Sequence, residues 1–291
     1  MITCHSEYGA IQSLWIKSAE AAFTNQDTLH NQWEDLNYLD EPNFEQAKIE
    51  YEDFVNHFEH EGLKLHHFGV DEEVMIDSIY CRDAAIATDH GMIICNMGKG
   101  ARINEPAAQK MAYEMAGIPI LGEIRTPGTL EGGDVAWLDE KSLAVGHTYR
   151  TNHSGIKQLK ALLEPHDISV IVAEMPHYKG QSDVFHLMSV LSPVDHDLAV
   201  VYSPLMPISF RNELLDRGFG LVEVPDEEFE SMGCNVLATA PRQCLMVAGN
   251  DITASRMRAA GCEVTTYDGA EISVKGGGGP TCLTRPMQRE I

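Results

Sequence analysis

The spacing of apolar residues predicts a helix near the start of the chain. Between residues 43 and 60, apolar positions recur every three or four residues and fall on one helical face: Phe44, Ala47, Tyr51, Phe54 and Phe58. Asn43 suits the N-cap, and Gly62 is a typical stop signal. A strand-sized apolar stretch, LKLHHFGV, comes next. We therefore expect a helix from about Asn43 to His60 that leads directly into a strand.

The same helix-to-strand transition occurs five times. EPAAQKMAYEMAG leads into IPILGEI, GIKQLKALLEPHD into ISVIVAEM, RNELLDRG into FGLVEV, and ITASRMRAAG into CEVTTY. The transitions lie near residues 62, 117, 167, 218 and 261, so that successive units are 43 to 55 residues long. Units of similar length, each with strands and one helix, are typical of repeat folds that close radially. We expect a single α/β domain over residues 1–291, with residues 1 to about 40 as a helical lead-in.

Polar and reactive residues recur at a similar distance after each transition. They are Asp83, Glu131, His186, Asn235 and Cys282, which follow their transitions by 14 to 21 residues. Equivalent positions of a radial repeat point toward one axis, so we expect these side chains to converge. Each also has a purely structural interpretation: a buried thiol, a satisfied histidine, a turn at the EGGD segment, or an ion pair of Asp83 with Arg82. Asn235 is interpreted as a turn or backbone-bonding residue and is left out of the expected site.

The charge balance restricts the classes of partner. The 291 residues include 21 Lys and Arg and 44 Asp and Glu, which gives a formal net charge of −23. A surface this acidic repels phosphate backbones and anionic lipids, so we expect neither nucleic-acid nor membrane binding. It attracts small cations, although a solvated acidic face needs no ligand.

The sequence also indicates the compartment. The N-terminal residues lack a basic region followed by an apolar run, and no apolar stretch reaches the ~20 residues that span a bilayer. Seven cysteines, an odd number without a C-x-x-C pair, argue against a disulfide scaffold and a structural zinc site. We expect a soluble, cytoplasmic protein with free thiols.

The expected cluster combines a nucleophile with a cation-binding environment. Cys282 with His186 in reach supplies a thiolate and a proton carrier. Glu131 and Asp83 would destabilise an oxyanion, which disfavours protease chemistry, but carboxylates form paired bonds with a guanidinium. A cationic substrate also lowers the pKa of the thiol, and the histidine then protonates the departing amine and later activates water. The residues favour a small cationic guanidino substrate, without a metal or other cofactor.

Several motifs at these positions resemble one known superfamily. They are Ile76-Asp77-Ser78-Ile79-Tyr80 leading into Arg82-Asp83, Glu131-Gly132-Gly133-Asp134, Tyr149-Arg150-Thr151-Asn152, His186-Leu187 and Gly279-Pro280-Thr281-Cys282. Together they resemble the guanidino-modifying enzymes of the pentein fold, which include dimethylarginine dimethylaminohydrolases, arginine deiminases and amidinotransferases. The resemblance covers residues 76 to about 285 and implies a five-bladed, pseudo-fivefold ββαβ propeller of the α/β class. Five blades agree with the five transitions.

The resemblance also implies roles for individual residues. Cys282 corresponds to the nucleophile and His186 to the general acid and base. Glu131 and Asp83 correspond to the carboxylates that bind the guanidinium, and Asp77 corresponds to a further substrate contact.

Two arginines correspond to residues that bind a substrate carboxylate. Arg150, in the YRTN motif, matches an arginine that binds the α-carboxylate, and Arg102 is a second candidate for that role. Asp134 is expected to stabilise the turn of the EGGD motif. A homo-oligomer is compatible with the sequence, which does not determine the oligomeric state.

Departures from the family patterns bear on the substrate. Arginine deiminases usually have Leu-Asp after the catalytic histidine, whereas here His186-Leu187 is followed by Met188. An apolar group tolerates N-methyl substituents better, which favours hydrolysis of an Nω-methylated arginine to citrulline and a methylamine. The Arg82-Asp83 pair, in contrast, is more similar to the deiminases. An arginine deiminase, an amidinotransferase and, from a different class, a non-catalytic binding protein with the pentein fold are the alternatives.

Overall fold

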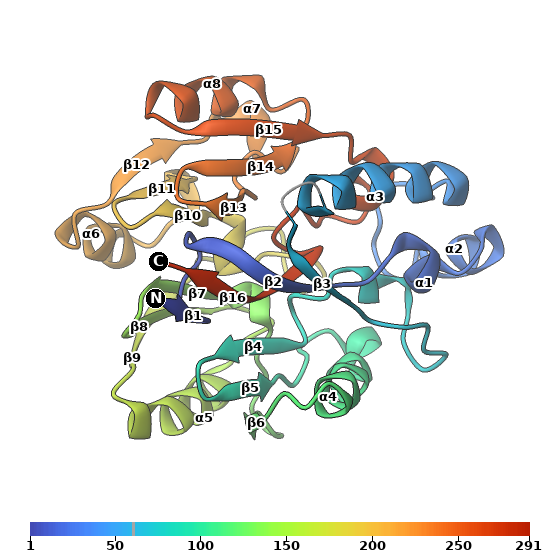
Figure 1. The fold of residues 1–291 in the computed structure, drawn as a ribbon, viewed down its shortest axis with the longest axis horizontal. Helices are drawn as coiled ribbons and strands as arrows, with labels where there is room; N and C mark the ends of the chain where they lie inside the picture. Colours follow the sequence, from blue (N-terminus) through green and yellow to red (C-terminus); the bar gives the residue numbers. More distant parts are fainter. Residues whose placement is uncertain (60–61) are drawn as a thin grey trace.

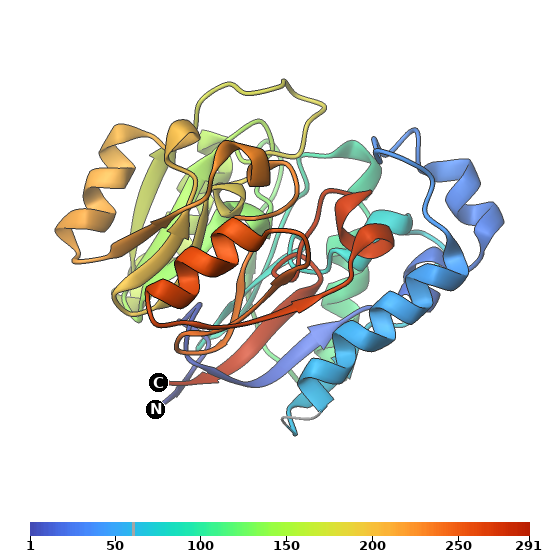
Figure 2. The ribbon, with the colours of Figure 1, turned by 90° about the horizontal axis from the view of Figure 1, so that it is seen from above.

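The computed structural model describes residues 1–59 and 62–291, which form small β-sheets with helices on the outside (Figure 1). One sheet contains both ends of the chain. Its strands lie in the order β1 (Ile2–Thr3), β16 (Thr284–Glu290), β2 (Ala10–Ile16) and β3 (Lys64–His67). β16 pairs antiparallel with β1 and β2, while β2 pairs parallel with β3. The two termini therefore lie side by side, as both views show (Figure 1 and Figure 2).

Four further sheets of the described residues have three strands each and share one topology. In each sheet two strands form an antiparallel hairpin, and the third strand lies parallel to the second. The strands are β4 (Ala85–Thr88), β5 (Gly91–Ile94) and β6 (Ile120–Glu123); β7 (Val135–Asp139), β8 (Ser142–His147) and β9 (Ser169–Glu174); β10 (Leu191–Asp195), β11 (Leu198–Val201) and β12 (Gly220–Glu223); and β13 (Leu237–Ala240), β14 (Gln243–Val247) and β15 (Glu263–Tyr267).

Helices make the parallel connections, as parallel strands require. The helices between the second and third strands of the four sheets are α4 (Glu105–Met115), α5 (His153–Leu163), α6 (Ile208–Asp216) and α8 (Asp251–Ala259). Three helices lie between β2 and β3: α1 (Ala19–Phe23), α2 (Gln26–Gln32) and α3 (Phe44–Glu59). A short helix, α7 (Asp226–Phe229), follows β12. None of the helices within residues 1–59 and 62–291 is long and apolar enough to cross a membrane.

The five predicted helix-to-strand transitions are confirmed, because α3, α4, α5, α6 and α8 precede β3, β6, β9, β12 and β15. Glycines at residues 62, 117, 218 and 261 end four of them with φ between 71° and 90°, where a side chain would be strained. At the remaining transition, between α5 and β9, Asp167 takes the place of the glycine, with φ of 58°. The predicted helix from Asn43 is α3, and its predicted last residue, His60, lies outside the described residues.

The expected helical lead-in over the first forty residues is wrong in its first part. Residues 2–3 and 10–16 form β1 and β2, and helix begins only at Ala19. The apolar segment AIQSLWI pairs with β16 on one side and β3 on the other. The antiparallel pair of β2 and β16 thus joins segments from opposite ends of the chain, and no local sequence pattern indicates such a pairing.

Buried charges connect the sheet that holds both termini to its neighbours. Arg82 is buried and lies 2.7 Å from the carboxylate of Glu7, and Nη2 of Arg285 donates to the carbonyl oxygen of Arg82. Clusters of buried apolar side chains surround this region. The backbone that carries Asp83 is therefore tightly held.

Candidate active site

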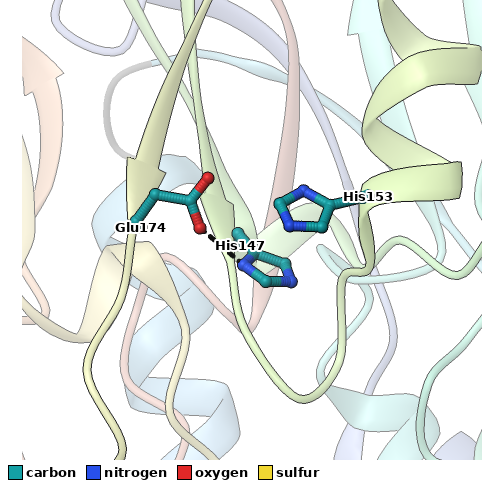
Figure 3. A group of neighbouring side chains, drawn as sticks. All are labelled: His147, His153 and Glu174. Carbon is teal, nitrogen blue, oxygen red and sulfur yellow. Dashed lines mark hydrogen bonds and ion pairs between the residues drawn. The ribbon is translucent and has the colours of Figure 1, made fainter.

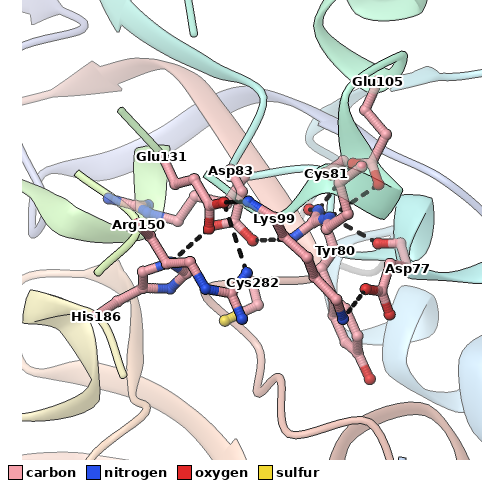
Figure 4. A network of polar contacts seen from close by, with 12 residues as sticks. Asp77, Tyr80, Cys81, Asp83, Lys99, Glu105, Glu131, Arg150, His186 and Cys282 are labelled. Carbon is pink, nitrogen blue, oxygen red and sulfur yellow. Dashed lines mark hydrogen bonds and ion pairs between the residues drawn. The ribbon is translucent and has the colours of Figure 1, made fainter. Parts of the chain in front are cut away.

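The segments that precede the first hairpin strand of each sheet bring the expected residues together (Figure 4). These residues lie two to five positions before β4, β7, β10, β13 and β16 and are Asp83, Glu131, His186, Asn235 and Cys282. Backbone hydrogen bonds join successive segments: Gly132 N–H donates to the carbonyl of Asp83 at 2.7 Å, and Arg82 N–H to that of Cys282 at 3.2 Å. Each of these residues occupies the equivalent place in front of its sheet. This explains why each follows its helix-to-strand transition by a similar number of residues.

Glu131 and His186 form a buried pair. Nε2 of His186 lies 2.8 Å from Oε2 of Glu131, and the side chain of Glu131 is fully buried. The other oxygen of Glu131 accepts the backbone N–H groups of Gly98 and Lys99, both at 2.9 Å. The pair joins the segments before β7 and β10 and orients the imidazole toward the centre of the site.

His186 is held in its charged form. Burial by itself lowers the pKa of His186, but the charges of Asp134 and Asp83 and the hydrogen bond to Glu131 raise it to about 9. Burial raises the pKa of Glu131, whereas the hydrogen bond and charge of His186 and the charge of Arg150 lower it to about 2. The pair is an imidazolium and a carboxylate at neutral pH, so His186 carries a proton that it can donate.

Asp83 presents one paired and one unpaired oxygen. Oδ2 lies 2.5 Å from Nη1 of Arg102, while Oδ1 is buried without a hydrogen-bond partner among the described residues. Arg102 also donates to Glu105 at 2.8 Å and to the carbonyl of Tyr80 at 2.9 Å. This geometry does not support the expected role of Arg102 as a carboxylate binder, because its donors are directed at protein acceptors. Arg102 instead holds Asp83 in position.

The thiol of Cys282 is oriented by Asn235. Nδ2 of Asn235 lies 3.3 Å from Sγ, and Oδ1 accepts the backbone N–H and the hydroxyl of Thr281 at 3.0 Å and 2.8 Å. Burial and the charge of Asp83 raise the pKa of the thiol, so the thiolate requires a nearby cation. Asn235 therefore belongs to the site although its residue type is typical of a turn, and its place among the five converging positions is the sequence signal for it.

Asp77 and Lys99 form an ion pair that the sequence did not predict. Nζ of Lys99 lies 2.6 Å from Oδ2 of Asp77. Asp77 is in the short helical turn before β4, and Lys99 comes from the segment after β5. Nothing in their spacing of 22 residues indicates this contact, which depends on how the two loops cross.

Arg150 is buried but keeps donors available. Nη1 lies 3.6 Å from Oε1 of Glu131, and Nη2 is 3.4 Å from the carbonyl oxygen of Asp183. The loop that carries Arg150 is held by Thr148, whose hydroxyl donates to Asp134 at 2.7 Å. Oδ1 of Asp134 accepts the N–H of Leu187 at 3.0 Å, which agrees with its expected structural role in the turn.

Six of the seven predicted site residues line one cavity. The lining residues are Asp77, Tyr80, Asp83, Lys99, Arg102, Arg150, Val184, His186, Gly276, Gly277, Gly278 and Cys282. The seventh, Glu131, is fully buried and contacts His186. A Cβ on Gly276 would overlap the hydroxyl oxygen of Tyr80, and one on Gly278 would overlap its ring, so the glycine tract lets the loop before Cys282 close the cavity.

The described residues contain groups that could offer three ligands to a metal ion. In the site, ligand atoms within 4.8 Å of one another come from Asp83, Glu131 and His186. The protonated imidazole offers no lone pair on Nε2, so this group favours an organic cation over a metal at neutral pH. A second group, His147, His153 and Glu174, lies at the ends of β8 and β9 and the start of α5 (Figure 3). There Nδ1 of His147 lies 2.6 Å from Oε2 of Glu174.

We expect the charged histidine to make stability depend on pH. A folded-state pKa of about 9, above the ordinary 6.5, means that His186 stabilises the fold fully below about pH 6.5 and that this contribution is lost as the pH rises through about 9. Denaturant unfolding at about pH 6 and about pH 9.5 measures this contribution. Between these two pH values, the free energy of unfolding of the wild type should fall by roughly 2 kcal/mol more than that of His186→Gln. Equal losses in the two chains would mean that His186 is not held charged.

Comparisons with known proteins place the chain in a family. The model of the family described as "N,N dimethylarginine dimethylhydrolase, eukaryotic" matches residues 18–289. The chain is 25% identical over 292 residues to the uncharacterized protein YkgA of Bacillus subtilis (strain 168), which covers 98% of this chain and 95% of that protein. It is 26% identical over 264 residues to an arginine deiminase of Mycobacterium avium (strain 104), which covers 78% of this chain and 64% of the deiminase. The chain thus spans slightly less than two thirds of the deiminase.

The fold is similar to that of solved pentein structures. One is the dimethylarginine dimethylaminohydrolase of Pseudomonas aeruginosa, as a cysteine-to-serine mutant complexed with citrulline, with a TM-score of 0.73 and 21% identity over 96% of this chain and 99% of that chain. The two structures share a mixed α/β architecture of small sheets. Since the family match spans most of its length, the chain belongs to the N,N dimethylarginine dimethylhydrolase family and is a pentein-superfamily enzyme of the guanidino-group hydrolase type.

Proposed function

We propose that the chain is a cofactor-free hydrolase of Nω-methylated guanidino groups, which converts Nω-methylated arginine into citrulline and a methylamine. One observation carries this proposal. Asp83, which keeps one carboxylate oxygen unpaired among the described residues, lines the same cavity as Cys282 and the charged His186. A cation acceptor, a nucleophile and a proton donor are the three groups that guanidinium hydrolysis requires.

The first half of the reaction forms a covalent intermediate. The guanidinium bonds to Asp83, and its positive charge lowers the pKa of the Cys282 thiol, which releases its proton to water and regains one when the carbon–sulfur bond breaks. The thiolate attacks the guanidinium carbon, the bond from that carbon to the methylated nitrogen breaks, and His186 donates its proton to the departing amine. An S-alkylthiouronium remains on Cys282, and His186 is now neutral.

The second half releases the product. Neutral His186 takes a proton from water, whose oxygen adds to the same carbon. The carbon–sulfur bond then breaks, which leaves a ureido group on the product and returns Cys282 and His186 to their starting forms. Glu131 supports both halves, because its carboxylate holds the imidazole in place and stabilises its charged form.

A neighbouring apolar cleft supports the methylated substrate. It shares Cys282 and His186 with the cavity and is also lined by Phe185, Met188 and Met232. Met188 is buried and stands where a second carboxylate would bind an unsubstituted guanidinium in a deiminase. Methyl groups on the reacting nitrogen gain apolar contacts with these three side chains, which the N–H groups of arginine do not make.

The sheet arrangement supports a propeller. We assign the four three-stranded sheets and the sheet that holds both termini as five blades around the axis on which the site residues meet. Each sheet has the same strand directions. Each also contributes one of the five converging residues, from the segment just before β4, β7, β10, β13 or β16.

A substrate comparison tests the function. Purified protein is incubated with Nω,Nω-dimethylarginine or with arginine, and citrulline, dimethylamine and ammonia are measured. We expect kcat/KM for the dimethylated compound to be about tenfold higher or more, because only that compound fills the apolar cleft. More efficient release of ammonia from arginine would mean a deiminase, and turnover that requires an added amine would mean an amidinotransferase.

A further inference from the structure

Asp77 already has a cationic partner inside the candidate substrate cavity. Nζ of Lys99 lies 2.6 Å from Oδ2 of Asp77 and 2.9 Å from the carbonyl oxygen of Leu36. The two charged side chains are only 12% and 5% exposed, so water screens the pair weakly. Figure 4 shows the backbone of Lys99 beside Glu131 and its side chain reaching Asp77. The backbone bond to Glu131 holds the segment, which fixes where the side chain begins.

The end of the cavity near Lys99 is therefore not anionic. Asp77 is balanced by Lys99, and Oδ2 of Asp83 is balanced by Arg102. Arg150 adds a third cation to the lining. Oδ1 of Asp83 is buried without a hydrogen-bond partner among the described residues, and the proposed reaction uses it for the guanidinium.

An α-amino acid would bring an ammonium as well as a carboxylate to this end of the cavity. An ammonium removed from water needs a carboxylate acceptor, since an unpaired buried charge is strongly destabilised. Lys99 already balances the charge of Asp77, so an ammonium on the other oxygen of Asp77 would lie a few ångströms from the Lys99 ammonium, and one carboxylate would face two weakly screened cations. A carboxylate, in contrast, can be accepted by Lys99 and Arg150 without breaking the ion pair.

We infer that Lys99 determines the substrate specificity of the site. Its ammonium occupies the place beside Asp77 that the α-ammonium of an amino acid would otherwise take, so the preferred substrates are guanidino carboxylic acids without an α-ammonium. This inference rests on the proposed hydrolysis at Cys282 and concerns only the far end of the substrate. The methylated guanidinium end is unchanged. The role of Asp77 changes from a direct substrate contact to the counter-ion of Lys99.

The test compares two substrates that differ only at the α-carbon. They are Nω,Nω-dimethylarginine and its desamino analogue, and release of dimethylamine is measured for both. In the wild type we expect kcat/KM to be at least about tenfold higher for the desamino compound, because binding it leaves no ammonium unpaired. Lys99→Met removes the charge and keeps the side-chain length, so Asp77 becomes free to accept an ammonium. This variant should reduce the preference at least about tenfold, mainly through a lower KM for dimethylarginine.

Two further variants distinguish a change in substrate preference from a general loss of activity or folding. Lys99→Arg keeps a cation beside Asp77 and should keep the preference. Loss of the preference in Lys99→Met, which has a side chain of similar length, is what a purely steric role of Lys99 would not predict. Lys110→Met removes a lysine that also lies 2.6 Å from a carboxylate, that of Glu123, but at the outer surface on α4. It should leave the preference unchanged.

The outcomes distinguish this inference from the proposed function. A wild type that hydrolyses both compounds with equal kcat/KM, or that prefers dimethylarginine, overturns the role of Lys99 and leaves hydrolysis at Cys282 standing. If neither compound releases dimethylamine and neither protects Cys282 from alkylation by iodoacetamide, both proposals are wrong. The wild-type comparison decides the matter even if Lys99→Met does not fold.

Discussion

Cys282→Ser is expected to lower kcat by at least about 1,000-fold while the fold is retained. A bound guanidinium lowers the pKa of a nearby acid by a few units, which suffices for a thiol with an ordinary pKa of about 8.5 but not for an alcohol. Asn235 can donate to the serine hydroxyl as it does to Sγ, so the geometry should persist. Dimethylamine release measures the rate, and circular dichroism with thermal unfolding measures the fold.

Cys4→Ser is the matched control. Cys4 and Cys282 are the two cysteines that are partly exposed, whereas the other five are buried. Burial and the charge of Asp89 raise the pKa of Cys4 to about 12, so this thiol is a poor nucleophile. We expect Cys4→Ser to hydrolyse substrate at the wild-type rate and to remain sensitive to iodoacetamide. A Cys282→Ser variant with more than about a tenth of the wild-type rate would rule out the covalent mechanism.

Glu131→Gln is expected to reduce kcat/KM by about 100-fold or more and to move the pH–rate profile toward lower pH. The substitution keeps the size of the side chain but removes the charge that helps to hold the proton on His186. With a lower pKa, His186 is less protonated at neutral pH and protonates the departing amine less often. The measurement is kcat/KM for the dimethylated substrate between about pH 5 and about pH 9.5.

Glu228→Gln shows whether any buried glutamate has this effect. Glu228 is also buried, but it accepts the N–H groups of Ile252 and Thr253 at the start of α8. Its replacement should weaken that helix end and lower thermal stability without shifting the pH–rate profile. If Glu131→Gln likewise changes stability alone, the assigned role of Glu131 is incorrect.

Much of the site was predictable because the reactive residues occupy equivalent places in similar units. Asp83, Glu131, His186 and Cys282 were selected by their distance from helix ends, and each lies just before the first hairpin strand of a sheet. The glycines at those helix ends adopt left-handed backbone, which is why they were reliable markers. The strand β2 was missed because its pairing partner lies at the other end of the chain.

The contacts within the site were less predictable. Arg102 has the residue type of a carboxylate binder, yet its side chain turns to Asp83 and Glu105. Asn235 resembles an ordinary turn residue, yet its amide reaches the thiol of Cys282. In both cases the direction of the side chain depends on groups from other segments of the chain: for Arg102 from the loop before β4 and from α4, and for Asn235 from the loop before β16.

The amino-acid sequence by itself determined the five helix-to-strand transitions and the spacing of the reactive residues after them, because these follow from local periodicity, glycine stops and repeat length. Only the tertiary structure decided how the charges are paired. A buried charge is balanced by whichever opposite charge lies within a few ångströms, and that neighbour comes from another loop. The pairing of Asp77 with Lys99 is the clearest case, because nothing in the sequence indicated that this expected site residue has a cationic partner within the chain.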